Sequence, residues 1–530
     1  MSPRLFPVCG VLALAMVQSS AAAGTDAAPA ATGRIATASG DVSYFRSDIR
    51  CRVPGPNEEA IPIGAVLAGA EAETLYSEAV SLTPLVSLGA DGYALAVATR
   101  AFSTGLTRGG GDVLLVGLGP DFTPRWATVY GGPAPDGPLS LTRTADGGLA
   151  IVGTSRSNYS SSLMRFLKES PESILVSKHA PDGQLQWAQV HTIGELIIAN
   201  PIVAMSDAGM VFGGTVRRDR RFAGFVLRLD DDGKLRWGRM LGPDFEVGVT
   251  WLVSTPEGGV LAGGPRQRVG RPGVKLTDLK FEIWLARLQG DGTVIWAKSY
   301  AADSGLSGVI AAPLRKRQGW LILREPRYDK STNRSRFPIF EVDETGVVRW
   351  AAEYELEGDG KVTTVLPSAG DGYLLVGPVS PKQDDGGTFA IEIGPDGDVR
   401  SSIWIDVVSA LSTTDRSAMM GNDPVAAVRD ADGMYVLMGD YMTLPRDLLA
   451  KARPGSRPPP DLREQLKAAV FLLRTGADGQ VRGCSLPLQV SSRSISIRAE
   501  DFGLVPTELP AGTMSDAPAS RLDIRRLESR

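Results

Sequence analysis

The sequence is poor in the residues on which many enzyme active sites depend. Its 530 residues include three cysteines and two histidines, and aromatic residues make up 7% of the chain. We find no Gly-x-Ser-x-Gly elbow, no His-Glu-x-x-His pair, no Cys-x-x-Cys pair and no phosphate loop. The common motifs of hydrolase, zinc, redox and nucleotide chemistry are therefore missing, and we expect a protein without catalytic activity.

The chain also lacks an excess of charge and a long apolar run. Sixty acidic residues stand against fifty-six basic ones, which gives a formal net charge of -4. Nothing in this balance favours a nucleic acid or a membrane surface as a partner. No segment approaches the roughly eighteen apolar residues of a membrane-spanning helix, so no transmembrane segment is predicted.

Residues 1–23 have the pattern of a secretory signal peptide. Arg4 precedes a short apolar run, and small residues ending at Ala23 follow it. We therefore expect an exported protein, periplasmic or secreted. Removal of the signal leaves Cys51 and Cys484, which an oxidising compartment favours as a disulfide, with two free thiols as the alternative.

A tight-turn element occurs seven times along the chain. The final glycines of successive turns lie 50 to 61 residues apart, and a short apolar stretch follows each turn. Each turn is therefore expected to join two antiparallel strands. The seven turns are Asp91-Gly92, Asp146-Gly147-Gly148, Asp207-Ala208-Gly209, Glu257-Gly258-Gly259, Gln318-Gly319, Asp371-Gly372 and Asp432-Gly433.

A second turn in each unit precedes a strand that carries a recurring tryptophan. In four units a glycine stands four residues before it, as in Gly233 and Trp237. A side chain of this size at one repeat position is best explained as a packing anchor between neighbouring units. The tryptophans at this position are Trp126, Trp187, Trp237, Trp296 and Trp350.

Seven units of about 55 residues, each with four strands and no helices between them, predict an all-β fold. We expect a seven-bladed β-propeller of four-stranded antiparallel blades. The repeat resembles the DGG-type propeller repeats of exported bacterial proteins. It is distantly similar to the tryptophan-docking repeat of pyrroloquinoline-quinone propellers, whose Gly-x-x-x-Trp ending matches residues 233–237. The resemblance covers about residues 75–490 and concerns the scaffold, so it implies little about activity.

The segments outside the repeats are expected to close the ring or to extend from it. We assign residues 41–505 to the propeller, with strands near both termini closing it, and a disulfide between Cys51 and Cys484 would fasten these ends. Residues 24–40 and 506–530 are expected to be flexible extensions. The insertion at 444–467 predicts two short helical turns around a polyproline segment.

Several connections between the second and third strands of the blades are long and basic. Long loops gathered on one face of a rigid ring are a typical binding surface, and arginines bind carboxylates, sulfates and phosphates. We therefore expect a protein partner, an anionic glycan or a lipid head group on this face, and a solvated charged rim is the alternative. The candidate ligand-binding residues are Arg217, Arg218, Arg220, Arg221, Arg266, Arg268, Arg271, Arg324 and Arg327.

Acidic residues precede the innermost strands of the blades. A ring of carboxylates there would bind a cation such as Ca²⁺, whereas the alternative is that these residues form turns. No other cofactor is predicted. The candidate metal ligands are Asp136, Glu246, Asp303, Asp359 and Asp423, with Glu195 in the corresponding link.

The leading interpretation is an exported, non-catalytic propeller that holds a ligand or protein partner on its basic loop face. The two histidines, His179 and His191, do not form a catalytic motif, and a surface position is expected for His191. The alternative is a propeller enzyme with its site at the acidic channel mouth, either a quinone-dependent dehydrogenase or a carbohydrate-active hydrolase or lyase. The adjacent cysteine pair of the quinone family is absent.

Overall fold

The computed structural model describes the repeat region and short strands near both termini. Within these residues, no helix has the length and apolar character needed to cross a membrane. The described residues are 84–99, 112–131, 136–155, 173–191, 196–218, 221–242, 245–268, 281–300, 309–314, 318–324, 326–382, 385–405, 407–409, 417–445, 467–481 and 485–501, with short segments between 32 and 71 and between 504 and 527.

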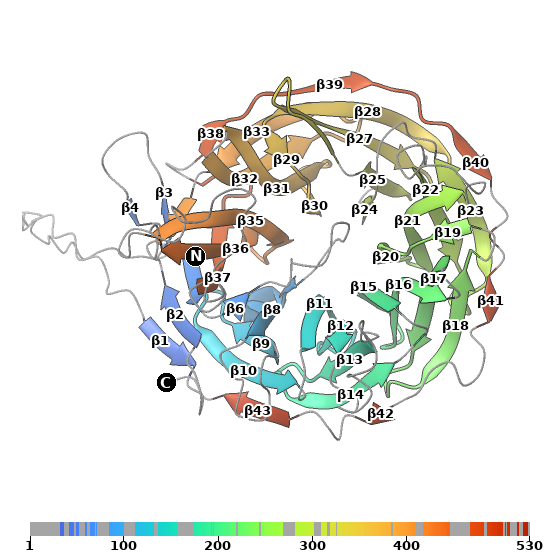
Figure 1. Cartoon of the computed structure of the whole chain (residues 1–530), viewed down its shortest axis with the longest axis horizontal. Coiled ribbons are helices and arrows are strands. Elements are labelled where there is room, and N and C mark those ends of the chain that lie inside the picture. Colours follow the sequence, from blue (N-terminus) through green and yellow to red (C-terminus); the bar gives the residue numbers. More distant parts are fainter. Residues whose placement is uncertain are drawn as a thin grey trace, which may run out of the picture.

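Seven antiparallel sheets stand radially around a central axis, so the chain is an all-β, seven-bladed β-propeller (Figure 1). Each of blades 1 to 6 is a meander whose first strand lies nearest the axis. Blade 1 contains β6 (Ala70–Glu71), β7 (Leu85–Ser87), β8 (Tyr93–Thr99), β9 (Asp112–Leu118) and β10 (Pro124–Gly131), with a single 3-10 turn at Gly89–Asp91. Blade 2 contains β11 (Asp136–Arg143), β12 (Leu149–Ser155), β13 (Ser173–His179) and β14 (Leu185–His191).

The next four blades repeat this pattern with local breaks in the innermost strand. Blade 3 contains β15 (Leu196–Ala204), β16 (Met210–Arg218), β17 (Arg221–Leu229) and β18 (Leu235–Leu241). Blade 4 contains β19 (Phe245–Val247), β20 (Trp251–Ser254), β21 (Val260–Arg268), β22 (Phe281–Leu288) and β23 (Val294–Tyr300). Blade 5 contains β24 (Val309–Pro313), β25 (Trp320–Arg324), β26 (Arg327–Asp329), β27 (Arg334–Val342) and β28 (Val348–Glu357). Blade 6 contains β29 (Asp359–Gly360), β30 (Thr364–Pro367), β31 (Tyr373–Lys382), β32 (Asp385–Ile393) and β33 (Val399–Ile405).

Blade 7 joins the two halves of the chain and closes the ring. Its inner strands are β35 (Ser417–Arg429), β36 (Tyr435–Pro445) and β37 (Lys467–Thr475), and its fourth strand is the N-terminal β5 (Gly64–Ala68). β2 (Val42–Arg46) and β1 (Thr32–Ile35) extend the same sheet outward. A small separate sheet contains β3 (Ile49–Cys51), β4 (Glu59–Ala60) and β34 (Val407–Ser409). The expected helical turns of 444–467 fall on 446–466, which lie outside the described residues.

The C-terminal segment adds one further strand to the outer edge of each of blades 1 to 6 (Figure 1). We call residues 485–527 the belt. Residues 24–40 and 506–530 were expected to be flexible extensions, yet β1 and the last three belt strands lie there. Their pairing depends on backbone groups at the edges of distant blades, which no local pattern reveals. The belt strands are β38 (Ser485–Pro487), β39 (Val490–Ser494), β40 (Ala499–Asp501), β41 (Thr507–Glu508), β42 (Ala517–Pro518) and β43 (Asp523–Leu527).

The hydrophobic core lies mainly between neighbouring blades. One cluster joins Trp251 of blade 4 to Trp320 and Phe340 of blade 5, and another joins Phe337 and Tyr354 of blade 5 to blade 6. Each blade is too thin to bury both of its faces alone, so its apolar side chains are buried only against the next blade. The blades therefore stabilise one another around the ring.

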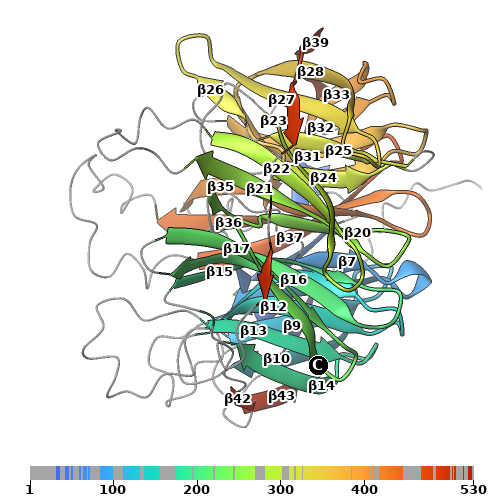
Figure 2. The same cartoon turned by 90° about the vertical axis from the view of Figure 1, so that its right-hand side faces the viewer.

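The meander gives the ring two different faces. The turns between first and second strands and between third and fourth strands form one face, which we call the hairpin face. The connections between second and third strands and the links between blades form the other, the loop face. Figure 2 shows the ring from the side, with the short hairpins at its right.

Candidate functional site

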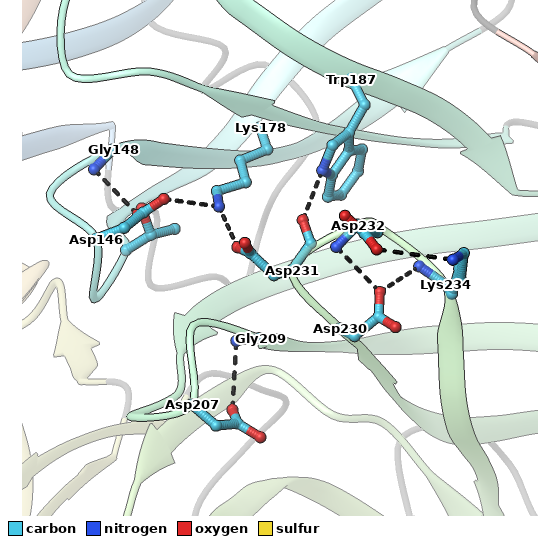
Figure 3. Close-up of polar contacts among 11 residues, drawn as sticks. Asp146, Gly148, Lys178, Trp187, Asp207, Gly209, Asp230, Asp231, Asp232 and Lys234 are labelled. Atoms are coloured by element: carbon cyan, nitrogen blue, oxygen red, sulfur yellow. Dashed lines mark hydrogen bonds and ion pairs between the residues drawn. The ribbon is translucent and has the colours of Figure 1, made fainter.

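On the hairpin face, aspartates accept hydrogen bonds from groups of their own turns. In blade 2, Asp146 accepts hydrogen bonds from the backbone N–H of Gly148, at 3.2 Å, and from the hydroxyl of Thr144. Asp207 accepts the corresponding bond from Gly209 in blade 3 (Figure 3). An aspartate in this position stabilises a turn through its own side chain, which explains its recurrence in the repeat.

Lys178 connects two of these turns across a blade boundary. It extends from β13, is 2% exposed, and donates to Asp146 of its own blade at 2.8 Å and to Asp231 of blade 3 (Figure 3). Burial disfavours the charged ammonium, but the hydrogen bonds to the two carboxylates outweigh it and raise the pKa of Lys178. Burial likewise acts to raise the pKa of Asp146, but hydrogen bonds from Lys178, Thr144 and Gly148 lower it to about 2. Lys178 and Asp146 are therefore charged at neutral pH.

The same clamp recurs in three other blades. Its cation lies on the third strand, and it contacts an acidic side chain of its own blade together with a backbone carbonyl of the next blade. Arg287 thus donates to Glu257 at 3.1 Å and to the carbonyl of Glu344 at 3.2 Å. The other members are Arg228 with Asp207 and the Gly290 carbonyl, and Arg474 with Asp430 and the Pro120 carbonyl.

Blade 5 reverses the charge at this position. Glu341 stands there, is fully buried, and accepts from Arg349 at 3.0 Å and from the indole of Trp350 at 3.1 Å. In blades 2 to 5 the clamp residue lies nine positions before the repeat tryptophan. This spacing is a sequence signal for the clamp, and it links the turns to the tryptophans.

Four of the five repeat tryptophans donate a hydrogen bond to the next blade. The Nε1 atom of Trp187 donates to the Asp231 carbonyl at 2.9 Å, and the equivalent atom of Trp237 donates to the Gly290 carbonyl at 2.8 Å. The other two bonds join Trp296 to the Glu344 carbonyl at 2.9 Å and Trp350 to the Pro395 carbonyl at 3.0 Å.

Each of the five indoles also covers the turn glycine of the following blade. A Cβ atom on Gly183 would lie 2.3 Å from the Trp126 ring, and one on Gly233 would lie 3.1 Å from the Trp187 ring. Because these glycines also have positive φ angles, near 80°, the motif requires glycine for two separate reasons. The tryptophans therefore pack between blades, and their rings are not arranged as a stacking surface for a ligand.

Both histidines are buried, so the expected surface position of His191 is wrong. The ring of His191 packs beside Phe212, at 6.1 Å between centroids, and it is 1% exposed. His179 lies 3.1 Å from the Ser177 hydroxyl, which in turn contacts the hydroxyl of Tyr130 in blade 1 at 2.8 Å. Burial lowers the pKa of His179 to about 4, so the ring is neutral at pH 7. These positions arise because both histidines end strands that face a neighbouring blade.

The structure separates the arginines expected on the loop face. Arg266 is 3% exposed and its Nη1 atom lies 3.0 Å from Glu282, while Arg324 is 4% exposed; neither has the exposed position expected of a surface ligand. Arg327 is exposed on β26. Arg217 and Arg218 end β16, Arg221 begins β17 and Arg268 ends β21, with only their backbone described; Arg220 and Arg271 lie outside the described residues.

The clearest charged feature of the loop face is a three-stranded extension of blade 5. β26, β27 and β28 place Arg327 directly opposite Arg336, and Arg336 directly opposite Glu355. Glu355 accepts from both Arg336, at 2.6 Å, and Arg334, at 2.7 Å, and these bonds hold its pKa below the usual range. We call Arg327, Lys330, Arg334, Arg336 and Glu355 the blade 5 cluster. Glu355 thus pairs with two cations, while Asp329 and Glu357 stand opposite Arg334 on the strands at either side.

Of the predicted metal ligands, only Asp136 and Asp359 are described with their side chains, so the carboxylate ring stays a prediction. Asp136 begins β11 in blade 2 and is 2% exposed, whereas Asp359 is exposed in β29 of blade 6. Only the backbone of Glu246, in β19, and Asp423, in β35, is described, and Asp303 and Glu195 lie outside the described residues. Among the described residues, no three His, Cys, Asp or Glu side chains are grouped as metal ligands.

The two cysteines predicted to pair are described unequally. The backbone of Cys51 ends β3 and pairs with Val407 of β34 and Glu59 of β4. Cys484 lies outside the described residues, so the disulfide stays a prediction.

Neither a scan against protein-family models nor a search of curated proteins finds a match to this chain.

Proposed function

We propose that this protein is an exported, non-catalytic propeller that binds an anionic partner on its loop face, with the blade 5 cluster as a main contact. The observation that carries the proposal is the direct opposition of Arg327 and Arg336 on neighbouring strands. Both side chains are exposed on paired strands, and a carboxylate, sulfate or phosphate group can accept hydrogen bonds from two guanidinium groups at once.

Exposed cations on the extension also support an anionic partner. Glu355 already accepts from two arginines, and Asp329 is engaged in its own turn through the N–H and hydroxyl of Ser331. Arg327 and Lys330 are exposed at the tip of the extension. Guanidinium groups on a paired sheet are held in place, so less rotamer entropy is lost when they bind.

The hairpin face offers less to an anion. Its clamp cations Lys178, Arg228 and Arg287 are each held between two blades and have little exposure, between 2% and 16% of the side chain. The exposed Lys234 and Arg236 lie within 4 Å of Asp232 and Asp230 of their own turn. A partner would have to displace these contacts before binding. We therefore place the partner on the loop face, where connections between strands project from a rigid ring.

Two parts of this proposal rest on the sequence. The pattern of residues 1–23 supports export. The packing of each tryptophan on the next blade's turn glycine supports the similarity to tryptophan-docking propellers, which concerns the scaffold and assigns no quinone to this chain.

The test is retention on a sulfated polyanion column, measured as the salt concentration needed for elution. We expect Arg327→Glu with Lys330→Glu to elute at clearly lower salt than the parent protein. The control is Lys234→Glu with Arg236→Glu, which makes the same charge change at exposed positions of the hairpin face and should elute close to the parent. Equal shifts in both variants, or none in either, would reject the proposed site.

A further inference from the structure

The belt follows the ring in reverse order. Its strands pair in turn with the outermost strands of blades 6, 5, 4, 3, 2 and 1, always antiparallel. The outer edge of blade 7, which is β5, is covered differently, by β2 and β1 from the N-terminal segment. The two ends of the chain therefore share the protection of all seven outer edges.

Apolar side chains anchor the belt between its strands. Leu488 is 7% exposed and packs in the cluster of blades 5 and 6, and Leu504 is 8% exposed and packs in that of blades 3 and 4. Between them, Ile495 and Ile497 are partly buried against the cluster of blades 4 and 5. The belt thus alternates a short strand on a blade with an apolar contact at the junction between blades.

Ion pairs distinguish one blade from the next along the belt. Arg493 contacts Glu353 of blade 5, Asp501 lies 3.6 Å from Lys298 of blade 4, and Glu508 lies 4.0 Å from Arg239 of blade 3. Along the belt these three residues are positive, negative and negative. Their partners on blades 5, 4 and 3 carry the opposite charges: negative, positive and positive. A shift of one blade would replace one attraction by a like-charge approach, Arg493 with Lys298 or Asp501 with Glu353, while another opposite-charge approach would remain. The three pairs therefore favour the observed register.

The belt is held less firmly than the blades. Its strands share two to five residue pairs with a blade, whereas β16 and β17 share nine. The belt partners of the three ion pairs are 70%, 86% and 88% exposed, and exposed pairs contribute little to stability and are screened by salt. Regions with few buried contacts open locally at lower free energy than the core.

We propose that the belt is a detachable clasp that opens from the intact ring and, while closed, shields the outer strands of blades 1 to 6 from pairing with other chains. An uncovered edge strand presents free N–H and C=O groups to any extended segment. The belt supplies these groups with partners in a register that its charges favour. This proposal is independent of the function proposed for the loop face.

Hydrogen–deuterium exchange of the whole protein, read by mass spectrometry, tests the clasp. In the parent protein we expect peptides covering β39 and β40 to exchange faster than those covering β27 and β28. Glu353→Arg should accelerate exchange across residues 490–508 about tenfold, because an attraction becomes a repulsion, and leave β27 unchanged. Glu353→Arg combined with Arg493→Glu should return the belt to within about threefold of the parent.

Three results would overturn the proposal. The belt would be an integral part of the blades if its peptides and theirs exchanged at one common rate in the parent protein. A Glu353→Arg variant with an unchanged belt would remove the role of the ion pair. Acceleration throughout blade 5 that the charge swap does not reverse would indicate general destabilisation.

Discussion

The hairpin face and the loop face are formed by the same strands, yet they treat charge in opposite ways. On the hairpin face, Lys178 and Arg287 are each held by an acidic group of their own blade and by a group of the next blade. On the loop face of blade 5, Arg327 and Arg336 stand opposite each other while Glu355 serves two arginines.

The difference follows from where the blades touch. Tight turns bring neighbouring blades close enough for one cation to reach both, so charges there are used to hold the ring together. On the blade 5 extension Arg327, Lys330 and Arg336 are exposed, so their charges meet solvent. Changes on the hairpin face should therefore alter stability, and changes on the loop face should alter binding alone.

The largest effect is expected where a turn glycine lies under a tryptophan. Gly183→Ala would place a methyl group 2.3 Å from the Trp126 ring at a φ of 80°, and we expect a loss of about 4 kcal/mol in urea unfolding. Gly258→Ala is the control, because Gly258 has a φ of 81° with nothing within 4 Å of the added methyl. It should cost about 1 kcal/mol. Equal costs would mean that the tryptophan contact contributes nothing.

A pH-dependent loss of stability should come from His179. Its folded pKa is about 4, while an unfolded histidine titrates near 6.5. Between these values the unfolded chain binds a proton at His179 that the native protein does not bind. The contribution of His179 to stability is therefore fully present above about pH 6.5 and is lost as the pH falls to 4. The share of His179 is about 3 kcal/mol.

His179→Gln should remove that share of the pH dependence. The measurement is the free energy of unfolding from pH 4 to pH 8 in both proteins, because subtracting the two curves cancels the common carboxylate contribution. Parallel curves would show that His179 does not remain neutral in the folded state.

A smaller effect is expected at the clamp. Lys178→Met keeps the buried stem but leaves Asp146 and Asp231 without their shared cation, and we expect a loss of about 2 kcal/mol in urea unfolding. The cost is moderate because both carboxylates retain contact with water. Lys234→Met, at a position that is 76% exposed, should change stability by less than about 0.5 kcal/mol.

The smallest effect should come from the loop face. Arg327→Glu with Lys330→Glu should leave the free energy of unfolding within about 0.5 kcal/mol of the parent, although retention on a polyanion falls. Thermal or urea unfolding of the variant used for the column test measures this directly. A large loss of stability would mean that these side chains hold the blade together, which would remove the contrast between the two faces.

Much of the fold follows from local patterns in the sequence. Turns such as Asp146-Gly147-Gly148, with an apolar stretch after each, predict hairpins, and their number predicts seven blades. The glycine four residues before each of four tryptophans marks the fourth strand. The clamp could also have been predicted from the sequence, because Lys178 and Arg228 each stand nine residues before a repeat tryptophan.

The candidate site was harder to predict from the sequence. Arg266 and Arg327 both belong to basic stretches, but one is buried against Glu282 and the other is exposed on β26. Composition does not separate these outcomes, because a residue's exposure depends on strand register and on what the neighbouring blade covers. His191 illustrates the same point, since a position at a strand end became an interior one.

The sequence by itself determined the repeat, the turns and the number of blades, because these depend on residues only a few positions apart. The tertiary structure alone decided which cations clamp two blades, which arginines remain exposed, and that six short strands between residues 485 and 527 pair with six outer edges. These outcomes depend on contacts between segments such as Arg493 and Glu353, which are 140 residues apart. Ring closure brings such groups together, and nothing in the local pattern of either segment indicates the other.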